Sequence, residues 1–284
     1  MKRLDEAYHY CYEVMNTNSK TFVKAFSFLP EQKRMAVWAV YTFCRHVDDI
    51  VDEEKSLEKL IQFKRELDLF LEGEFSTKNK LWLALNDVFT RFPMDPEPFY
   101  LMIEGQGLDF QKNRYNSLAE VEYYSYRVAS SVGLMLLPIL APEPTERLKE
   151  GAIKLGIAMQ ITNILRDIGE DLDRDRIYIP ADLLQKYNYG IEDLTANIVD
   201  DRFTRLVEDL ATYAERLYEE ALESTNDYPL YSRLPVQAAN FSYRAILNEI
   251  RKNNYNVFTK RAVVSSSEKA NIFKLIKQTM KALA

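Results

Sequence analysis

Apolar residues recur every three or four positions along most of the chain, and no segment alternates apolar and polar residues as a half-buried strand does. This spacing predicts helices at residues 4–16, 30–52, 57–72, 78–91, 97–111, 118–140, 145–173, 202–226, 233–254 and from 268 to the end. Helix breakers separate these ranges at Pro30, 92–98, 141–144, Gly190 and Pro229. No linker rich in Ser or Gly divides the chain. We therefore predict one all-α domain over residues 1–284.

Composition agrees with a folded helical protein and narrows its class. Of 284 residues, 47% are apolar and only 8 are Gly. The net charge of −6 and the lack of a basic run argue against a nucleic-acid partner. Cys11 and Cys44 match no metal-ligand spacing, so we expect reduced thiols in the cytoplasm. There is no signal-peptide pattern, and the best apolar run, 132–141, is too short to span a bilayer.

Two acidic clusters carry the first chemical signal. Asp48 and Asp52 are four residues apart, and so are Asp167 and Asp171. On helices, each pair projects from one face, one turn apart. Two such pairs across a cavity would hold several divalent metal ions with open coordination positions, as the departure of a diphosphate group requires. The clusters therefore predict an enzyme that ionises an allylic diphosphate.

Each acidic pair ends a stripe whose character changes along its helix. At about 100° per residue, the first stripe contains Trp38, Tyr41, Arg45, Asp48 and Asp52. The second contains Ile153, Gly156, Gln160, Asn163, Asp167 and Asp171. Side by side, two such helices would line a cavity that is apolar at one end and metal-binding at the other. Gly156 costs about 1 kcal/mol against Ala inside a helix, so we expect a close helix contact or room for a ligand there.

The alternative for both clusters is a solvated acidic helix face. Like charges four residues apart are mildly destabilising, so their repetition calls for a compensating cation. Gln160 and Asn163 lie beside the second cluster, in a stripe where a core would not accept unpaired amides. Both observations favour the metal site.

These residues, with several other blocks, resemble the head-to-head prenyl synthases, the family of squalene, dehydrosqualene and phytoene synthases. The blocks are 19–22 (SKTF), 28–30 (FLP), 39–52 (AVYTFCRHVDDIVD), 124–133 (YSYRVASSVG), 160–171 (QITNILRDIGED), 176–180 (RIYIP) and 243–247 (YRAIL). They cover nearly the whole chain in the family's order. The overall pattern looks closest to the bacterial dehydrosqualene synthases.

The resemblance implies an all-helical isoprenoid-synthase fold with a central cavity. It implies several Mg²⁺ ions, held by Asp48, Asp52, Asn163, Asp167 and Asp171. It implies substrate contacts from Ser19, Lys20, Thr21, Phe22, Tyr41, Arg45, Gln160, Asn163, Arg166, Tyr243 and Arg261. Tyr124 and Arg166 join the four aspartates as implied catalytic residues. Arg can donate two parallel hydrogen bonds to phosphate oxygens, and aromatic faces can stabilise a carbocation.

The implied reaction joins two farnesyl diphosphates through a cyclopropyl diphosphate to dehydrosqualene, in carotenoid biosynthesis. NADPH is not expected, and Gly105-Gln-Gly107 lacks the third glycine and preceding strand of a dinucleotide site. Two alternatives stay open: a phytoene synthase that uses the C20 diphosphate, and an NADPH-dependent squalene synthase. An amphipathic substrate and a hydrocarbon product imply peripheral membrane contact. No segment identifies a protein partner.

Other classes fit less well. A terpene cyclase shares paired acidic motifs but is not expected to carry the 176–180 block. A di-iron bundle needs two Glu-x-x-His units, and only Glu6-Ala-Tyr-His9 qualifies. An inactive assembly factor would be expected to lose the aspartates of the two clusters, and this chain keeps them. The family pattern is broken at Ser125 and Ser130, where Cys and Gly are usual, which bears on the role of Tyr124.

Bulky side chains on the apolar side of the metal sites are expected to limit substrate length. Trp38 lies ten and fourteen residues before Asp48 and Asp52, which is about 15 to 21 Å along a helix and comparable to an extended farnesyl chain. Phe22 and Phe26 are four residues apart on another helix and could close the same end. This arrangement predicts a C15 substrate over a C20 one. The alternative is that all three are ordinary core residues.

Overall fold

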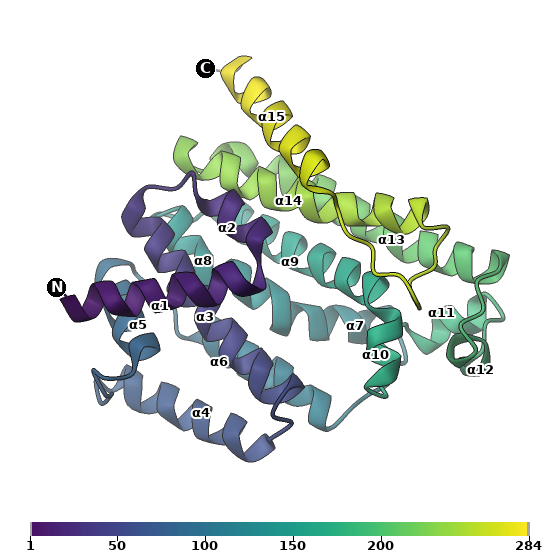
Figure 1. Ribbon diagram of the computed structural model, residues 1–284, viewed down its shortest axis with the longest axis horizontal. Coiled ribbons are helices and arrows are strands. Elements are labelled where there is room, and N and C mark those ends of the chain that lie inside the picture. The colour runs from purple at the N-terminus through teal and green to yellow at the C-terminus, as the bar shows by residue number, and fades with distance from the viewer. Residues whose placement is uncertain (1, 283–284) are drawn as a thin grey trace.

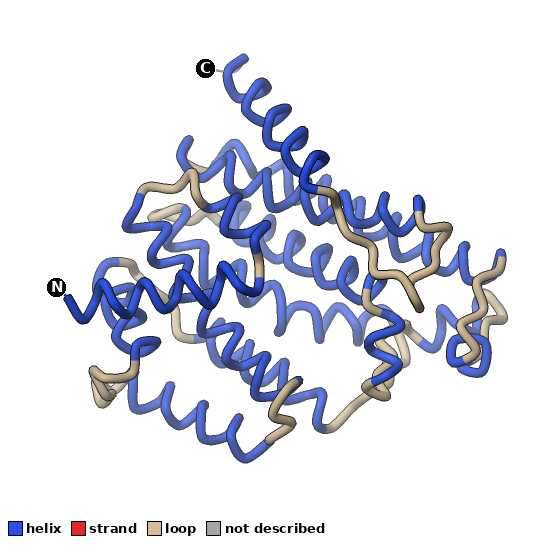
Figure 2. The backbone as a smooth tube through the Cα atoms, in the orientation of Figure 1, coloured by secondary structure: helices blue, strands red, loops and turns tan. Residues whose placement is uncertain are grey.

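The chain folds almost entirely into helices, and the computed structural model describes residues 2–282. The α-helices are α1 (Lys2–Asn18), α2 (Lys20–Phe26), α3 (Glu31–Asp52), α4 (Leu57–Leu71), α5 (Lys80–Arg91), α6 (Glu97–Gly107), α7 (Leu118–Ser125), α8 (Ser131–Leu140), α9 (Glu146–Arg166), α10 (Ile168–Asp173), α11 (Ala181–Lys186), α12 (Ile191–Thr195), α13 (Asp201–Glu223), α14 (Leu230–Lys252) and α15 (Ser266–Ala282). Shorter turns are η1 (Leu108–Phe110), the π-turn η2 (Tyr126–Ser130) and η3 (Thr225–Asp227). Figure 2 shows helices and loops only within the described residues. The predicted all-α class is confirmed.

Every range predicted as helical contains a helix, but two of the long ones are interrupted. The π-turn divides 118–140. The predicted helix 145–173 breaks at Asp167, whose φ of −106° and ψ of 14° leave the helical region. The short helices α11 and α12 were not predicted, because six and five residues are too few to show a period. The helix expected to carry Phe22 and Phe26 is α2.

Two glycines let neighbouring helices pack tightly against the π-turn. A Cβ on Gly156 would lie 2.5 Å from backbone atoms of Ser130, and one on Gly105 would lie 2.6 Å from Cβ of Arg127. Ser130 Oγ also donates a hydrogen bond of 2.7 Å to the carbonyl of Ile153 in α9. The unfavourable glycine inside α9 is therefore explained by close helix contact.

Helices α3 and α9 form opposite sides of the centre of the molecule (Figure 1). α3 packs against α1, α5 and α8, and α9 packs against α13, α8 and α14. Each buries an apolar face in the main core, through residues such as Phe43 and Val47 on α3 and Ile161 and Leu165 on α9. Their acidic faces are left to line a cavity between them.

A connecting segment, residues 253–265, joins α14 to α15 and passes beside α10 (Figure 1). A Cβ on Gly169 of α10 would lie 2.5 Å from the carbonyl oxygen of Phe258, so the two backbones touch. α15 packs against α14, and its Phe273 and Ile276 form a small second core with Ala25 and Ala238. Residues from near both chain ends therefore meet on one side of the cavity.

Candidate active site

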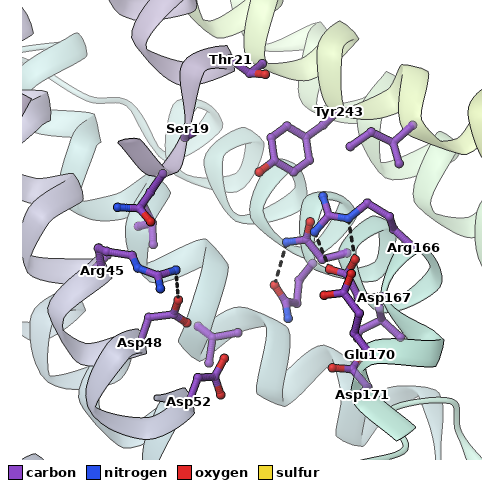
Figure 3. A pocket seen from close by; sticks show the side chains of 18 of the residues that line it. Ser19, Thr21, Arg45, Asp48, Asp52, Arg166, Asp167, Glu170, Asp171 and Tyr243 are labelled. Carbon is purple, nitrogen blue, oxygen red and sulfur yellow. Dashed lines mark hydrogen bonds and ion pairs between the residues drawn. The ribbon is translucent and has the colours of Figure 1, made fainter. Parts of the chain in front are cut away.

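An open polar cavity of about 700 Å³ lies between α3, α6, α9, α10, α14 and the connecting segment. Its wall contains all the metal-binding, substrate-binding and catalytic residues implied by the sequence: Ser19, Lys20, Thr21, Phe22, Tyr41, Arg45, Asp48, Asp52, Tyr124, Gln160, Asn163, Arg166, Asp167, Asp171, Tyr243 and Arg261. Figure 3 shows Asp48 and Asp52 on one side and Asp167 and Asp171 on the other. The fold thus brings the two acidic clusters face to face, and the role of each residue stays a prediction.

Arginines hold the carboxylates on the α3 side. Arg45 Nη1 pairs with Asp48 Oδ2 at 2.9 Å, and its Nη2 pairs with Asp49. From beyond α10, Arg176 donates to Asp52 Oδ1 at 2.6 Å and Arg174 donates to Oδ2 at 3.1 Å. These cations come from one turn earlier in α3 and from the segment that follows the second acidic cluster.

The helix break at Asp167 shapes the opposite side. Arg166, the last residue of α9, donates to Asp167 Oδ1 at 2.7 Å through Nε and to Oδ2 through Nη2. The backbone N–H of Asp171 still donates to the carbonyl of Asp167 at 2.8 Å, so the one-turn spacing survives the break. Glu170 pairs with Arg261 of the connecting segment at 2.9 Å.

The acidic residues fit a bound divalent cation. Burial, and then the charge of Asp52, raises the pKa of Asp48 to about 6 against the pull of Arg45. Burial, and then the charge of Asp167, raises the pKa of Asp171 to about 8. Asn163 Oδ1 is buried and has no hydrogen-bond partner. These oxygens are the ligands that Mg²⁺ prefers, and the protein's own cations leave them under-compensated.

Within residues 2–282, no three acidic, imidazole or thiol groups cluster closely enough to hold a metal ion alone. An ion at either acidic cluster would therefore need further oxygen ligands. Water and the phosphate oxygens of a substrate supply such ligands, because Mg²⁺ keeps several waters or substrate oxygens in its shell.

The raised pKa of Asp171 predicts that the metal-free protein loses folding stability as pH rises. Its pKa is higher in the folded chain than the unfolded value of 3.8, so folding stability falls as pH rises from about 4 to about 8. We expect Asp171→Asn in EDTA to melt several degrees above wild type at pH 8 and at the same temperature at pH 4. Mg²⁺ with diphosphate should stabilise wild type more than the variant. Calorimetry showing equal metal-free melting temperatures at pH 8 would contradict this.

A buried carboxylate that the sequence did not single out, Asp109, belongs to the cavity wall. The side chain of Asp109 is 2% exposed. It accepts hydrogen bonds from the Tyr178 hydroxyl at 2.9 Å and the Tyr124 hydroxyl at 3.1 Å, and it lies 3.5 Å from Arg176 Nη1. The ring of Tyr178 stacks on those of Tyr115 and Tyr124, and all three centroids are 5.0–5.5 Å apart. Asp109 thus links the tyrosines to the arginine that holds Asp52.

An apolar pocket of about 220 Å³ continues from the polar cavity. The two share Phe22, Tyr41, Val128, Val132, Gln160, Asn163 and Tyr243. Beyond these, apolar side chains line the pocket, among them Phe26, Val37, Leu140, Tyr228 and Val236. Phe22 stacks on Tyr243, with ring centroids 5.4 Å apart, where the two spaces meet. The polar-to-apolar grading expected from the two stripes is present.

Trp38 does not line either space, so its predicted place at the end of the substrate pocket is wrong. Its ring packs against Tyr12 of α1, with centroids 5.0 Å apart, and lies 5.6 Å from the guanidinium carbon of Arg34. Val37 and Val40 face the pocket from α3 instead. On α9, Ile153 is likewise absent from the pocket wall, and Ala152 and Leu155 line it. Both stripes therefore predict the cavity-facing residues correctly at the polar end. At the apolar end, neighbouring residues of the same helices face the pocket instead.

Comparison with known proteins decides the family. The model of the squalene/phytoene synthase family matches residues 15–268. The chain belongs to this family. It is 37% identical to the 15-cis-phytoene synthase of Synechococcus elongatus, with 94% of this chain and 91% of that protein covered. It is 40% identical to the chloroplastic phytoene synthase 2 of Solanum lycopersicum, with 94% and 88% covered.

Solved structures of squalene/phytoene synthase relatives share the fold. A dehydrosqualene synthase solved with a ligand superimposes with a TM-score of 0.94 at 38% identity, over 99% of both chains. The squalene synthase HpnC of Alicyclobacillus acidocaldarius superimposes with a TM-score of 0.83 at 25% identity, over 90% of this chain and 97% of that one. The isoprenoid-synthase fold expected from the resemblance is confirmed.

Two serines at which the chain departs from the squalene/phytoene synthase pattern are accommodated by backbone carbonyls. Ser125 Oγ donates to the carbonyl of Val121 at 2.7 Å, and Ser130 Oγ donates to Ile153 as described. Both residues are fully buried. Neither change removes Tyr124 from the cavity wall.

Proposed function

We propose that this enzyme joins two farnesyl diphosphates head to head to give dehydrosqualene, with Mg²⁺ and without NADPH. The observation that carries the proposal is the continuity of a polar, acid-lined cavity with an apolar pocket. On α3, Val37 in the pocket lies eleven residues before Asp48, which is about 16 Å along a helix and comparable to an extended C15 chain.

Each part of the site has a proposed role in the two ionisations. Mg²⁺, when bound by the two acidic clusters, would neutralise charge on the departing diphosphate. Arg45, Arg166 and Arg261 donate hydrogen bonds to the diphosphate oxygens as the carbon–oxygen bond breaks and its electron pair leaves with diphosphate. Phe22 and Tyr243, whose rings lie where the polar and apolar spaces meet, have the proposed role of stabilising the charge of the allylic cation.

The bond changes follow from the two substrates. The double bond of the second molecule attacks C1 of the cation, and loss of one proton closes a cyclopropyl diphosphate. Departure of the second diphosphate allows the ring to rearrange to a linear cation. Loss of a second proton then gives the hydrocarbon without any reductant.

A second candidate is the same condensation of two C20 diphosphates to phytoene. It is favoured by the similarity to proteins named phytoene synthases. The test is incubation with C15 or C20 diphosphate and Mg²⁺, with and without NADPH, followed by mass analysis of the extracted lipid. Dehydrosqualene from the C15 substrate, unchanged by NADPH, is the expected result. Faster conversion of the C20 substrate than of the C15 substrate would instead support the phytoene candidate.

Phe26 offers a test of chain-length control with a matched control. Its side chain lines the apolar pocket and is 6% exposed. We expect Phe26→Ala to admit the C20 donor and yield some C40 product, because the shortened side chain opens space at the apolar end. Trp38→Ala removes an even larger ring, which lines neither space, and should leave the product at C30. Equal C40 yields from both variants, measured by mass analysis, would contradict this.

Peripheral membrane contact stays a prediction. Within residues 2–282, no helix is both long and apolar enough to cross a bilayer. The proposed product is insoluble in water, so its release calls for a lipid surface. We expect part of the protein to sediment with liposomes and turnover to rise when liposomes are added. No sedimentation, together with turnover indifferent to lipid or detergent, would contradict membrane contact.

A further inference from the structure

The segment Gly105-Gln-Gly107, at the end of α6, places a buried amide against the acidic end of α3. Gln106 is 7% exposed and belongs to the cavity wall. Its Nε2 donates a hydrogen bond of 3.1 Å to Asp48 Oδ1. The other oxygen, Oδ2, pairs with Arg45 at 2.9 Å. The two oxygens of Asp48 therefore have partners of different kinds, one neutral and one cationic.

Close packing on both sides fixes the position of Gln106. A Cβ on Gly105 would lie 2.6 Å from Cβ of Arg127 and 2.8 Å from Cγ1 of Val128, both in the π-turn. A Cβ on Gly107 would lie 3.3 Å from Leu60 of α4. Backbone held this tightly in a packed core cannot shift without repacking its neighbours. The amide of Gln106 is therefore anchored to the scaffold.

Arg45, in contrast, is partly exposed and shared between two carboxylates. Its side chain is 27% exposed at the cavity and also pairs with Asp49. An anion in the cavity can draw the guanidinium away from Asp48, and a divalent cation can then replace it as the partner of the carboxylate. Oδ2 of Asp48 then becomes available to a metal ion, while Oδ1 keeps its hydrogen bond to Gln106.

We propose that Gln106 is a positioning residue, which fixes the carboxylate of Asp48 through Oδ1 so that Oδ2 is presented to Mg²⁺. This inference rests on the metal-dependent function proposed above. Hydrogen-bond partners of ligating carboxylates hold the ligand in its binding orientation, and their loss typically costs about 10–100-fold in metal affinity. A buried amide that only satisfied the packing of α6 would affect stability and leave metal affinity unchanged.

Two variants separate these roles. Gln106→Met keeps the length of the side chain and removes the donor, whereas Gln106→Asn keeps an amide that is too short to reach Oδ1. Binding of Mn²⁺ with inorganic diphosphate is measured by titration calorimetry, and metal-free melting temperature is measured in EDTA. We expect both variants to weaken Mn²⁺–diphosphate binding by about 10–100-fold. The melting temperature should change by only a few degrees, because water in the open cavity can solvate Oδ1.

Gln111→Met is the matched control, since Gln111 is exposed just after η1 and does not line the cavity. It should bind as wild type does. Wild-type affinity in the folded Gln106 variants would overturn the positioning role, and if Gln106→Met fails to fold, Gln106→Asn decides. Asp48→Asn distinguishes the two proposals. If it binds as tightly as wild type, the metal assignment fails with the positioning role; if it alone loses binding, only the positioning role fails.

Discussion

Replacing Asp167 or Asp48 by Asn is expected to lower turnover by orders of magnitude while the protein stays folded. The two residues lie on opposite sides of the cavity (Figure 3), and each belongs to an acidic pair one turn apart. An amide loses the charge with which a carboxylate binds a divalent cation, so the departing diphosphate would lose its main electrostatic support. The fold should survive, because removing one of two like charges four residues apart relieves repulsion.

Asp173→Asn serves as the control for this comparison. Asp173 is exposed at the end of α10, two residues after Asp171, and does not line the cavity. Steady-state turnover at saturating Mg²⁺ and substrate should match wild type in this variant. Near-normal turnover in a folded Asp167→Asn protein, with circular dichroism unchanged, would remove the basis for the proposed metal role.

Asp109→Asn is expected to lower turnover by roughly 10- to 100-fold, as loss of a group that supports a metal-binding carboxylate does. Asp109 acts on Asp52 indirectly, because it contacts Arg176, which donates a hydrogen bond to Asp52. A neutral amide there would loosen this arginine and shift both tyrosine hydroxyls. Stability should not fall, because burial already raises the pKa of Asp109 to about 6 and makes its charge costly near neutral pH.

The same aromatic stack supplies a control for Asp109. The hydroxyl of Tyr115 is buried without a hydrogen-bond partner, and Tyr115 does not line the cavity. Tyr115→Phe should therefore keep full turnover and leave stability equal or slightly higher. Tyr178→Phe removes a hydrogen-bond donor to Asp109, so its turnover should lie between those of Tyr115→Phe and Asp109→Asn. Wild-type turnover in Asp109→Asn would show that the link through Arg176 is not needed.

The polar half of the site could be predicted from sequence because its acids and amides recur at the helical period along two helices. On α3 and α9, acids and amides recur at the helical period against an apolar background, and that pattern fixes which side chains point the same way. The apolar half could not be fixed in this way. Trp38 has the right spacing, but only the packed structure shows that α1 places Tyr12 against its ring.

Gln106 and Asp109 were missed for a different reason. The buried residues of α6 extend around most of its circumference, so no amphipathic pattern indicates the side that faces the cavity. The break at Asp167 has no Pro beside it, and Gly169, two residues later, lies inside α10 rather than at the break. Contacts distant in sequence hold it, including the ion pair between Glu170 and Arg261. Such features depend on which segments meet in the folded chain, and local sequence patterns do not reveal that.

The ion pairs between Asp52 and the two arginines beyond α10 have a consequence for how the protein matures. They join residues 122 and 124 positions apart, whereas a helix forms from neighbours four residues apart. Contacts of such long range require closure of a large loop, and this entropic cost makes them slow to form. A chain can therefore acquire nearly all of its helices before the two acidic clusters face each other. Helical content is for this reason a poor measure of catalytic competence during refolding, and recovery of activity should lag behind recovery of the circular dichroism signal.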